Sequence, residues 1–569
     1  MSSTPDLVIR GGTIADGSGG ALYEADLAVS GGKISAIGQN LPKGEEEIDA
    51  KGKLVTPGFV DVHTHYDAQV TWSNRISPSS WNGVTTVMVG NCGVGFAPCK
   101  PHQRDELVEL MEGVEDIPEV VLTEGLPWNW ETFGEYLDSL DGKRFDLDVV
   151  TQVPHAALRV YVMGERGVAR EDATAEDRAA MARLAAEGIR AGALGFSTSR
   201  TINHRTVAGA YTPTLGAAEQ ELVEIARAVG ETGSGWLQVI SDFDEPEEEM
   251  AMLRRMARAS GRPMTMTVLE LDKRPDVWRR TMAGIAEANA AGERITGQVL
   301  TRPIGLMLGF EISLNPFMLC DSWKQIEHLS HPEKIAALRD PAFKERLLTE
   351  FPENHPQAFR VANFAQMFPL GDPPNYEPDP ATSIAAEAAR QGRKPHELAF
   401  DLLMEKEGKA ILFSARANYA QGNLESVREM MSHPNTLVGL GDGGAHVGVL
   451  TDASAMTYLL THWTRDRTRG EKLPVEWAVK RLSRDNAHAI GLSDRGELSV
   501  GKKADINVID YDSLAICPPE VLYDLPAGGK RMVQRIQGYD ATIVSGQAVY
   551  RNGEATDALP GRLVRGASR

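Results

Sequence analysis

Two histidines two residues apart, His63 and His65, are the strongest chemical signal in the sequence. They follow the apolar run Leu54-Val-Thr-Pro-Gly-Phe-Val-Asp-Val, which is typical of a buried strand. Because strand residues two apart face the same side, both imidazoles can reach one divalent ion. Asp61 and Asp67 could orient the imidazoles from behind. The pair predicts half of a metal site, and the alternative is two exposed histidines at a strand end.

The elements that must position this pair alternate between strands and helices. Helical stretches such as 176–191 and 217–232 carry apolar residues at three- and four-residue spacing. This alternation predicts an α/β fold, a (β/α)₈ TIM-like barrel whose active site lies at the carboxyl ends of the strands. The eight candidate strands are 54–63, 85–90, 148–155, 193–197, 235–240, 263–269, 294–299 and 436–441.

Short β-type runs broken by glycines occur near both ends of the chain. They predict a small β-sandwich domain formed jointly by residues 1–56 and 495–569. The barrel then spans 57–312 and 417–494. The stretch 313–416 is irregular and too long for an ordinary loop, so we interpret it as an inserted subdomain before the last strand, where it could form a lid. Its aromatic residues could cover an apolar pocket or simply form a subdomain core.

Composition narrows the possible partners. Lys+Arg 59 against Asp+Glu 79 gives a net charge of −20, which repels phosphate backbones and anionic membranes. We therefore expect neither nucleic acid nor a membrane as partner. We expect a small-molecule substrate, and we expect copies of the chain to form a homo-oligomer. The 4 cysteines are too few for a disulfide framework in 569 residues, and the start lacks the pattern of a secretory signal. These features predict a cytoplasmic protein.

Several further motifs occur in a fixed order along the chain. Together with the His-Thr-His strand they resemble the amidohydrolase superfamily and, within it, the N-acyl-D-amino-acid deacylases. The resemblance covers nearly the whole chain and rests on Gly83-Val-Thr-Thr-Val, Gly90-Asn-Cys-Gly-Val-Gly, Gly195-Phe-Ser-Thr-Ser, Gly441-Asp-Gly-Gly-Ala-His, Asp494-Arg-Gly-Glu-Leu and Gly501-Lys-Lys-Ala-Asp.

The resemblance implies a ligand set. In that family the first strand supplies two metal-bound histidines, here His63 and His65, and the second supplies a metal-bridging cysteine, here Cys92. The last strand supplies an aspartate for metal binding and proton transfer, here Asp442. A small buried hydrophobe is the alternative for Cys92, and a helix cap is the alternative for Asp442.

Four further residues are expected to bind substrate. Ser199 and Arg200 resemble the loop that holds the substrate carboxylate, since a guanidinium grips a carboxylate with two hydrogen bonds. An ordinary surface arginine is the alternative. His446 lies in the same loop as Asp442, and a hydrogen bond to Asp442 is the alternative to substrate contact. His155 lies at the end of the third candidate strand, where a structural histidine is the alternative.

The sequence departs from the family at strands five and six. There the deacylases carry histidines for the tighter metal, whereas this chain offers Gln238, Asp242 and Glu270 as nearby polar groups. Three outcomes follow: a single ion, a second ion on oxygen ligands, or a decayed site. The retained His, His, Cys and Asp set argues against decay, so we expect Zn²⁺ or another divalent metal, as one or two ions.

The function predicted from these residues is hydrolysis of a non-peptide amide bond in a small N-acylated compound by metal-activated water. An N-acyl-D-amino acid is the substrate class that the resemblance implies. A cyclic amide or lactone hydrolase is the alternative enzyme, because this fold hosts several chemistries. A catalytically silent ligand-binding or scaffold protein is the alternative of another class.

Overall fold

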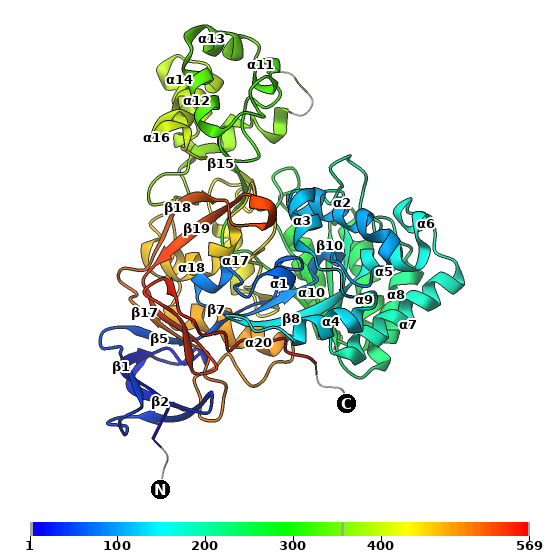
Figure 1. Ribbon diagram of the computed structural model, residues 1–569, viewed down its shortest axis with the longest axis vertical. Helices are drawn as coiled ribbons and strands as arrows, with labels where there is room; N and C mark the ends of the chain where they lie inside the picture. Colours follow the sequence, from blue (N-terminus) through cyan, green and yellow to red (C-terminus); the bar gives the residue numbers. More distant parts are fainter. Residues whose placement is uncertain (1–3, 354, 356–357, 567–569) are drawn as a thin grey trace.

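A computed structural model describes residues 4–353, 355 and 358–566 of the chain. Eight parallel strands form one sheet in the order β16-β12-β11-β10-β9-β8-β7-β6, and β7, β8 and β10 are labelled in Figure 1. They are β6 (Phe59–Asp61), β7 (Val84–Val89), β8 (Asp148–Pro154), β9 (Gly195–Arg200), β10 (Trp236–Ser241), β11 (Met264–Thr267), β12 (Ile295–Gln298) and β16 (Thr436–Leu437). All eight coincide with candidate strands of the sequence.

The sheet curls so that its first and last strands meet. Just beyond β6 and β16, the His65 N–H donates to the Gly443 carbonyl at 2.8 Å and the Asp442 N–H donates to the His63 carbonyl at 3.0 Å. These bonds join the two edges of the sheet at the carboxyl end of the ring. The predicted TIM-like barrel is thereby confirmed.

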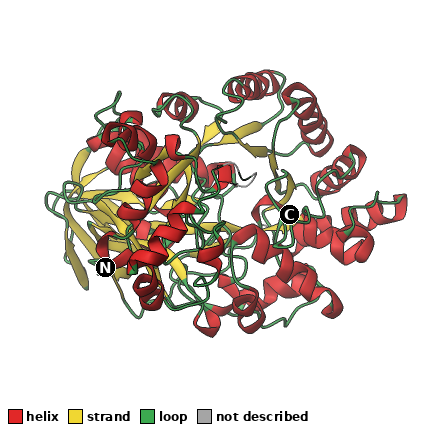
Figure 2. Ribbon diagram, turned by 90° about the horizontal axis from the view of Figure 1, so that it is seen from above, coloured by secondary structure: helices red, strands yellow, loops and turns green. Residues whose placement is uncertain are grey.

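Helices cover the outer face of the barrel (Figures 1 and 2). Helix α7 begins at a capping box, in which Thr174 accepts from the Asp177 N–H and Asp177 accepts from the Thr174 N–H. Its apolar side, which includes Met181, Ala185 and Ile189, is buried. The barrel helices are α1 (Gln69–Trp72), α2 (Arg104–Glu115), α3 (Glu119–Gly125), α4 (Phe133–Asp141), α5 (His155–Met163), α6 (Glu165–Val168), α7 (Ala175–Ala191), α8 (Glu219–Glu231), α9 (Pro246–Ser260), α10 (Val277–Ala290), α17 (Glu425–Ser432), α18 (Ala455–Tyr458), α19 (Val475–Lys480) and α20 (Asn486–Ala489).

The first candidate strand, 54–63, divides into two strands that belong to different sheets. Strand β5 (Leu54–Pro57) joins the sheet of the chain ends, and β6 joins the barrel. The division falls at Gly58, where a Cβ would lie 2.2 Å from the Thr85 Oγ1. The missing side chain lets the backbone pass close to β7 as it moves from one sheet to the other.

Segments from both ends of the chain share one nine-stranded sheet, in which β5 pairs with β17. This confirms that the two ends join, while the sandwich form and the exact domain boundaries stay predictions. The sheet contains β1 (Leu7–Ile14), β2 (Tyr23–Ser30), β3 (Lys33–Gly38), β4 (Glu46–Asp49), β5, β17 (Ile506–Ile509), β20 (Tyr539–Val544), β21 (Gln547–Arg551) and β22 (Glu554–Ala555). Strands β18 (Ala515–Leu522) and β19 (Arg531–Gln537) form a separate hairpin.

The inserted stretch forms a helical lobe that stands apart from the barrel helices (Figure 1). Phe310, Phe317 and Trp323 are buried in a core of its own. The aromatic residues are therefore explained as a subdomain core. The lobe contains β13 (Ile304–Leu308), α11 (Asp321–Lys324), α12 (His331–Arg339), α13 (Pro341–Thr349), β14 (Met367–Pro369), α14 (Ile384–Gln391), α15 (Pro395–Leu403), α16 (Glu405–Gly408) and β15 (Leu412–Ala417).

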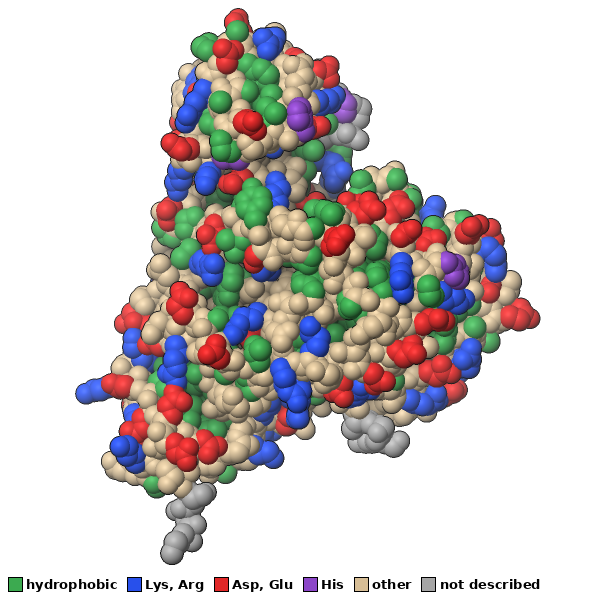
Figure 3. Space-filling model, viewed as in Figure 1, with side chains coloured by type: hydrophobic (Ala, Val, Ile, Leu, Met, Phe, Trp, Pro, Cys, Tyr) green, Lys and Arg blue, Asp and Glu red, His purple; other side chains and the backbone are tan. Residues whose placement is uncertain are grey.

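The surface carries charges of both signs, with acidic and basic side chains interspersed over the face shown in Figure 3. Among the described residues, no helix is both long and apolar enough to cross a membrane.

A buried ion pair anchors the lobe to the barrel. Glu377 accepts hydrogen bonds from Arg467 at 3.0 and 3.1 Å, and it lies 2.8 Å from the His462 Nε2. Arg467 and Glu377 are 1% and 3% exposed, so loss of either leaves a buried charge short of a partner, although Glu425 also lies 2.8 Å from Arg467. Burial alone would raise the pKa of Glu377, but the bonds from His462 and Arg467 lower the pKa to about 2.

We expect Glu377→Ala to reduce the free energy of unfolding by about 3 kcal/mol, because it leaves the Arg467 guanidinium buried without its main partner. Thermal and urea unfolding of the whole chain measure the loss. Glu387→Ala is the matched control, because Glu387 pairs with Arg390 on an exposed face of α14. Equal effects of the two substitutions would contradict the anchoring role.

The same pair predicts a pH dependence. The folded state holds the pKa of Glu377 below the ordinary value of 4.5, so its stabilisation is complete above about pH 5 and is lost as the pH falls toward about 2. The difference in unfolding free energy between wild type and Glu377→Gln should therefore shrink on acidification. A difference that is constant from neutral to acidic pH would contradict this.

Candidate metal centre

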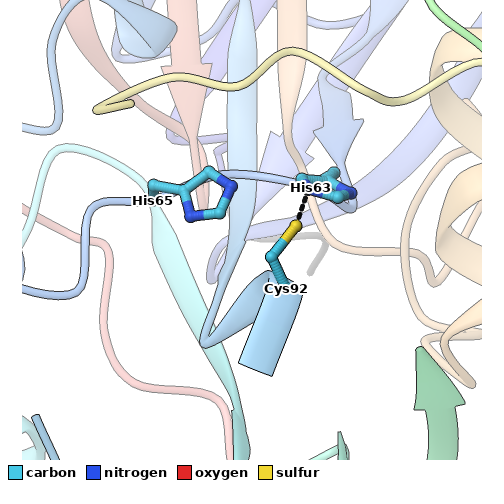
Figure 4. Close-up of side chains that lie close together, drawn as sticks. All are labelled: His63, His65 and Cys92. Atoms are coloured by element: carbon cyan, nitrogen blue, oxygen red, sulfur yellow. Dashed lines mark hydrogen bonds between the residues drawn. The ribbon is translucent and has the colours of Figure 1, made fainter. Parts of the chain in front are cut away.

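The predicted ligands converge at the carboxyl end of the barrel. His63 and His65 follow β6, and Cys92 lies in the short 3₁₀ turn Asn91–Gly93 after β7 (Figure 4). The His63 Nε2 lies 3.2 Å from the Cys92 Sγ, and one donor atom from each of the three residues falls within 4.8 Å of the others. All three side chains are buried. The structure thus brings together residues from two strands as the sequence predicted.

Asp442 enters the cluster from the last strand. Its Oδ1 lies 3.5 Å from the His63 Nε2 and 3.7 Å from the His65 Nε2. Cys92, Asp442 and His446 all have left-handed backbone conformations, with φ of 54°, 43° and 46°. Such conformations cost free energy in residues with a side chain and concentrate at functional sites.

Each ligand histidine has a polar partner on its other ring nitrogen. The His63 Nδ1 lies 2.6 Å from the Gln298 Oε1, and the His65 Nδ1 lies 2.9 Å from a carboxylate oxygen of Glu115. Asp61 instead accepts the backbone N–H groups of His63 and Gly441. The sequence suggested that Asp61 and Asp67 orient the imidazoles. In the structure Gln298 and Glu115 occupy that position.

Sequence reasoning missed both of these partners. Gln298 left a weak signal, because an amide at the carboxyl end of a buried barrel strand is unusual among apolar neighbours. Glu115 left none, since it ends α2, an amphipathic helix with several other glutamates.

Burial controls the protonation of the cluster. It lowers the pKa of His63 to about 3, so this ring is neutral and can offer a lone pair. It raises the pKa of Cys92 to about 11 and that of Asp442 to about 7. At His65 burial acts in the opposite direction to Glu115, and the carboxylate raises the pKa of the imidazole well above its usual value.

This donor set fits a divalent metal. Two imidazoles, a thiol that a bound cation would ionise, and a carboxylate are the ligand types that Zn²⁺ takes in proteins. The buried Glu115 carboxylate adds a negative charge behind His65, which favours a cation at the centre.

Two of the other predicted site residues, His155 and Arg200, lie in separate networks. His155 is fully buried, with Nδ1 2.8 Å from the Thr198 Oγ1 and Nε2 2.7 Å from the Glu221 Oε1. Glu221 also pairs with Arg159 at 2.6 Å. With both ring nitrogens engaged, the geometry favours the structural interpretation of His155. Its role in substrate binding stays a prediction that these contacts do not support.

Arg200 is also engaged. Its guanidinium binds Glu249 of α9 at 2.9 Å and donates to the Ala217 carbonyl. Because the Arg200 guanidinium already binds the Glu249 carboxylate, its role in binding a substrate carboxylate stays a prediction that these contacts do not support.

Ser199 and His446 lie closer to the centre. The Ser199 Oγ is 2.9 Å from the Nδ1 of His204, a buried histidine that the sequence analysis did not single out. Burial raises the pKa of Glu115, but His65, His446 and His204 together lower it to about 2. The Val447 N–H, next to His446 in the chain, donates to the Glu115 carbonyl at 3.1 Å, so the His446 loop contacts the residue behind His65.

Comparisons with known proteins agree with this geometry. The amidohydrolase family model matches residues 46–550. The chain belongs to the amidohydrolase family. It is accordingly an enzyme that hydrolyses carbon–nitrogen bonds other than peptide bonds.

Two relatives from Alcaligenes xylosoxydans xylosoxydans match this chain over almost its whole length. The chain is 27% identical to an N-acyl-D-aspartate deacylase over 98% of this chain and 95% of the relative, and 27% identical to an N-acyl-D-glutamate deacylase over 99% and 97%. A solved D-aminoacylase, described as having a binuclear metal center, shares the fold with a TM-score of 0.67 at 23% identity, covering 99% of this chain and 100% of that chain.

We expect Glu115→Gln to weaken metal binding by about 10-fold to 100-fold, because the substitution removes the charge that supports His65 as a ligand. Competition with a chromophoric chelator measures the affinity. Glu109→Gln, an exposed change in the same helix, is the control. Equal affinities would contradict the role assigned to Glu115.

Proposed function

We propose that the chain hydrolyses the amide bond of an N-acyl-D-amino acid at a Zn²⁺ centre of one or two ions. The observation that carries the proposal is the convergence of His63, His65, Cys92 and Asp442 at the mouth of the barrel. The substrate class is supported by the relatives that span the whole chain, which are named as deacylases of N-acyl-D-aspartate and N-acyl-D-glutamate.

The ligand residues divide the work between binding and proton transfer. A divalent ion held by His63, His65 and Cys92 would supply a Lewis acid that activates water and polarises the substrate carbonyl. Asp442 would accept the proton of the attacking water and deliver it to the leaving amine. Its role as base is supported by the position of its Oδ1, which lies 3.5 Å from the His63 Nε2 and 3.7 Å from the His65 Nε2.

Binding of the rest of the substrate is proposed for the loops around the centre. His446 shares a loop with Asp442, and the Oγ of Ser199, near the end of β9, lies 2.9 Å from the Nδ1 of His204 in the loop that follows β9. Both loops follow barrel strands at the end where such enzymes bind substrate. A cytoplasmic location and a homo-oligomeric state belong to the same proposal.

Metal content tests the centre directly. Plasma mass spectrometry of the purified chain should find bound Zn²⁺, with less in His63→Ala and Asp442→Ala. His102→Ala, an exposed substitution, should match wild type. A wild type that contains no metal and takes up none on reconstitution would overturn the mechanism.

Activity tests the role of Asp442. With N-acyl-D-amino acids as substrates, Asp442→Asn should lower kcat by about 100-fold or more, because the amide cannot accept the proton. The L-enantiomers and lactones serve as comparison substrates. An Asp442→Asn variant with normal metal content and unchanged kcat would contradict the assignment of the base.

A further inference from the structure

Two buried glutamines from neighbouring parts of the barrel hold the metal ligands from behind. The Cys92 backbone N–H donates to the Gln238 Oε1 at 2.8 Å. Because a backbone N–H is always a donor, this bond fixes which end of the Gln238 amide faces Cys92. The Nε2 amide group of Gln238 must then point elsewhere in the barrel, and it has no partner among the described protein atoms.

The orientation of the Gln298 amide follows from the position of the His63 ring proton. For the His63 Nε2 to offer a lone pair toward Cys92 and Asp442, the proton of the neutral ring must sit on Nδ1. That proton points to the Gln298 Oε1 at 2.6 Å. The Gln298 Nε2 is therefore also turned into the barrel interior, buried and without a described protein partner.

Strand β11 lies between the strands of the two glutamines, and we call the inner face of β10, β11 and β12 the glutamine wall. Its register pairs Thr265 with Gln238 and Thr267 with Gln298. Both threonines are buried, and their hydroxyls also have no described protein partner. The inner face of β10, β11 and β12 beside the ligand cluster therefore presents amide N–H donors and hydroxyls.

The two carboxylates that follow β11 and β10, Glu270 and Asp242, are engaged elsewhere. Glu270 accepts from the Ala420 N–H at 3.1 Å and from the Ser426 hydroxyl at 2.8 Å. Asp242 accepts from the Thr201 hydroxyl and from the Ile202 N–H. Among the described residues, His63, His65 and Cys92 form the one group of three metal-binding side chains.

We propose that this centre takes one metal ion, and that Gln298 and Gln238 are positioning residues that replace ligands for a second. Amide N–H groups repel a cation, and both amide oxygens are already committed to holding His63 and Cys92. The glutamine wall thus orients the ligands of one metal ion and excludes a second metal ion. The inference rests on the proposed function, because it concerns the same centre.

Stoichiometry is the first test. The apo protein is titrated calorimetrically with Co²⁺ and with Zn²⁺, and bound metal is measured by plasma mass spectrometry after gel filtration. We expect one equivalent at saturation. The electron paramagnetic resonance spectrum of the Co²⁺ form should show an isolated high-spin ion, and thiolate-to-metal absorption should report Cys92 as a ligand.

Variants of Gln298 test positioning separately. Gln298→Ala should weaken Co²⁺ binding by about 10-fold to 100-fold, because it removes the acceptor for the His63 Nδ1 proton. Gln298→Glu keeps an acceptor and should restore the affinity. Gln391→Ala, on the lobe, is the matched control, and thermal unfolding of each apo protein reports whether the variant is folded.

The outcomes separate this inference from the proposed function. Two equivalents of metal with a coupled Co²⁺ spectrum would overturn the one-ion centre and leave the metal hydrolase intact. No binding after reconstitution would overturn both. An unchanged affinity in Gln298→Ala would overturn the positioning role, and this affinity measurement stays informative even when activity is unaffected. If Gln298→Ala does not fold, the wild-type stoichiometry and the Gln298→Glu affinity still decide.

Discussion

The whole centre depends on two backbone hydrogen bonds that close the barrel. The Asp442 N–H meets the His63 carbonyl, and the His65 N–H meets the Gly443 carbonyl. Since these residues are themselves predicted ligands or their neighbours, closing the ring and assembling the predicted ligand set are one event. Asp61 strengthens the seam by accepting N–H groups from both sides of it. A distortion of the seam would therefore change stability and chemistry together.

The two histidines of the centre have unequal surroundings. His63 rests on a neutral amide, and His65 rests on a carboxylate. A carboxylate behind an imidazole makes that ring a stronger electron donor than an amide does. The ion would thus sit in an asymmetric field, with the more strongly donating side toward α2. Asp442, which is near both rings, completes the charge balance.

The sequence predicted the barrel, the union of the chain ends and the convergence of His63, His65, Cys92 and Asp442, because each depends on local patterns or on a family motif. The sequence did not identify Gln298 and Glu115 as partners of the histidines, because no motif surrounds them. Their contacts join residues that are 235 and 50 positions apart in the chain. Arg200 illustrates the opposite failure. Its type and place suggested an anion anchor, but a sequence cannot show that Glu249 already occupies it. The split of the first strand at Gly58 likewise depends on how closely β7 approaches.

The pairing of β5 with β17 has a consequence for biosynthesis. Strand β5 emerges from the ribosome early, whereas β17 is translated roughly 450 residues later, which at ordinary elongation rates is a delay of about half a minute or more. During that interval the edge of β5 lacks its neighbour and could pair with another chain. A chaperone that covers this edge during the interval would reduce such pairing, so the yield in a heterologous host should depend on how long the edge stays protected.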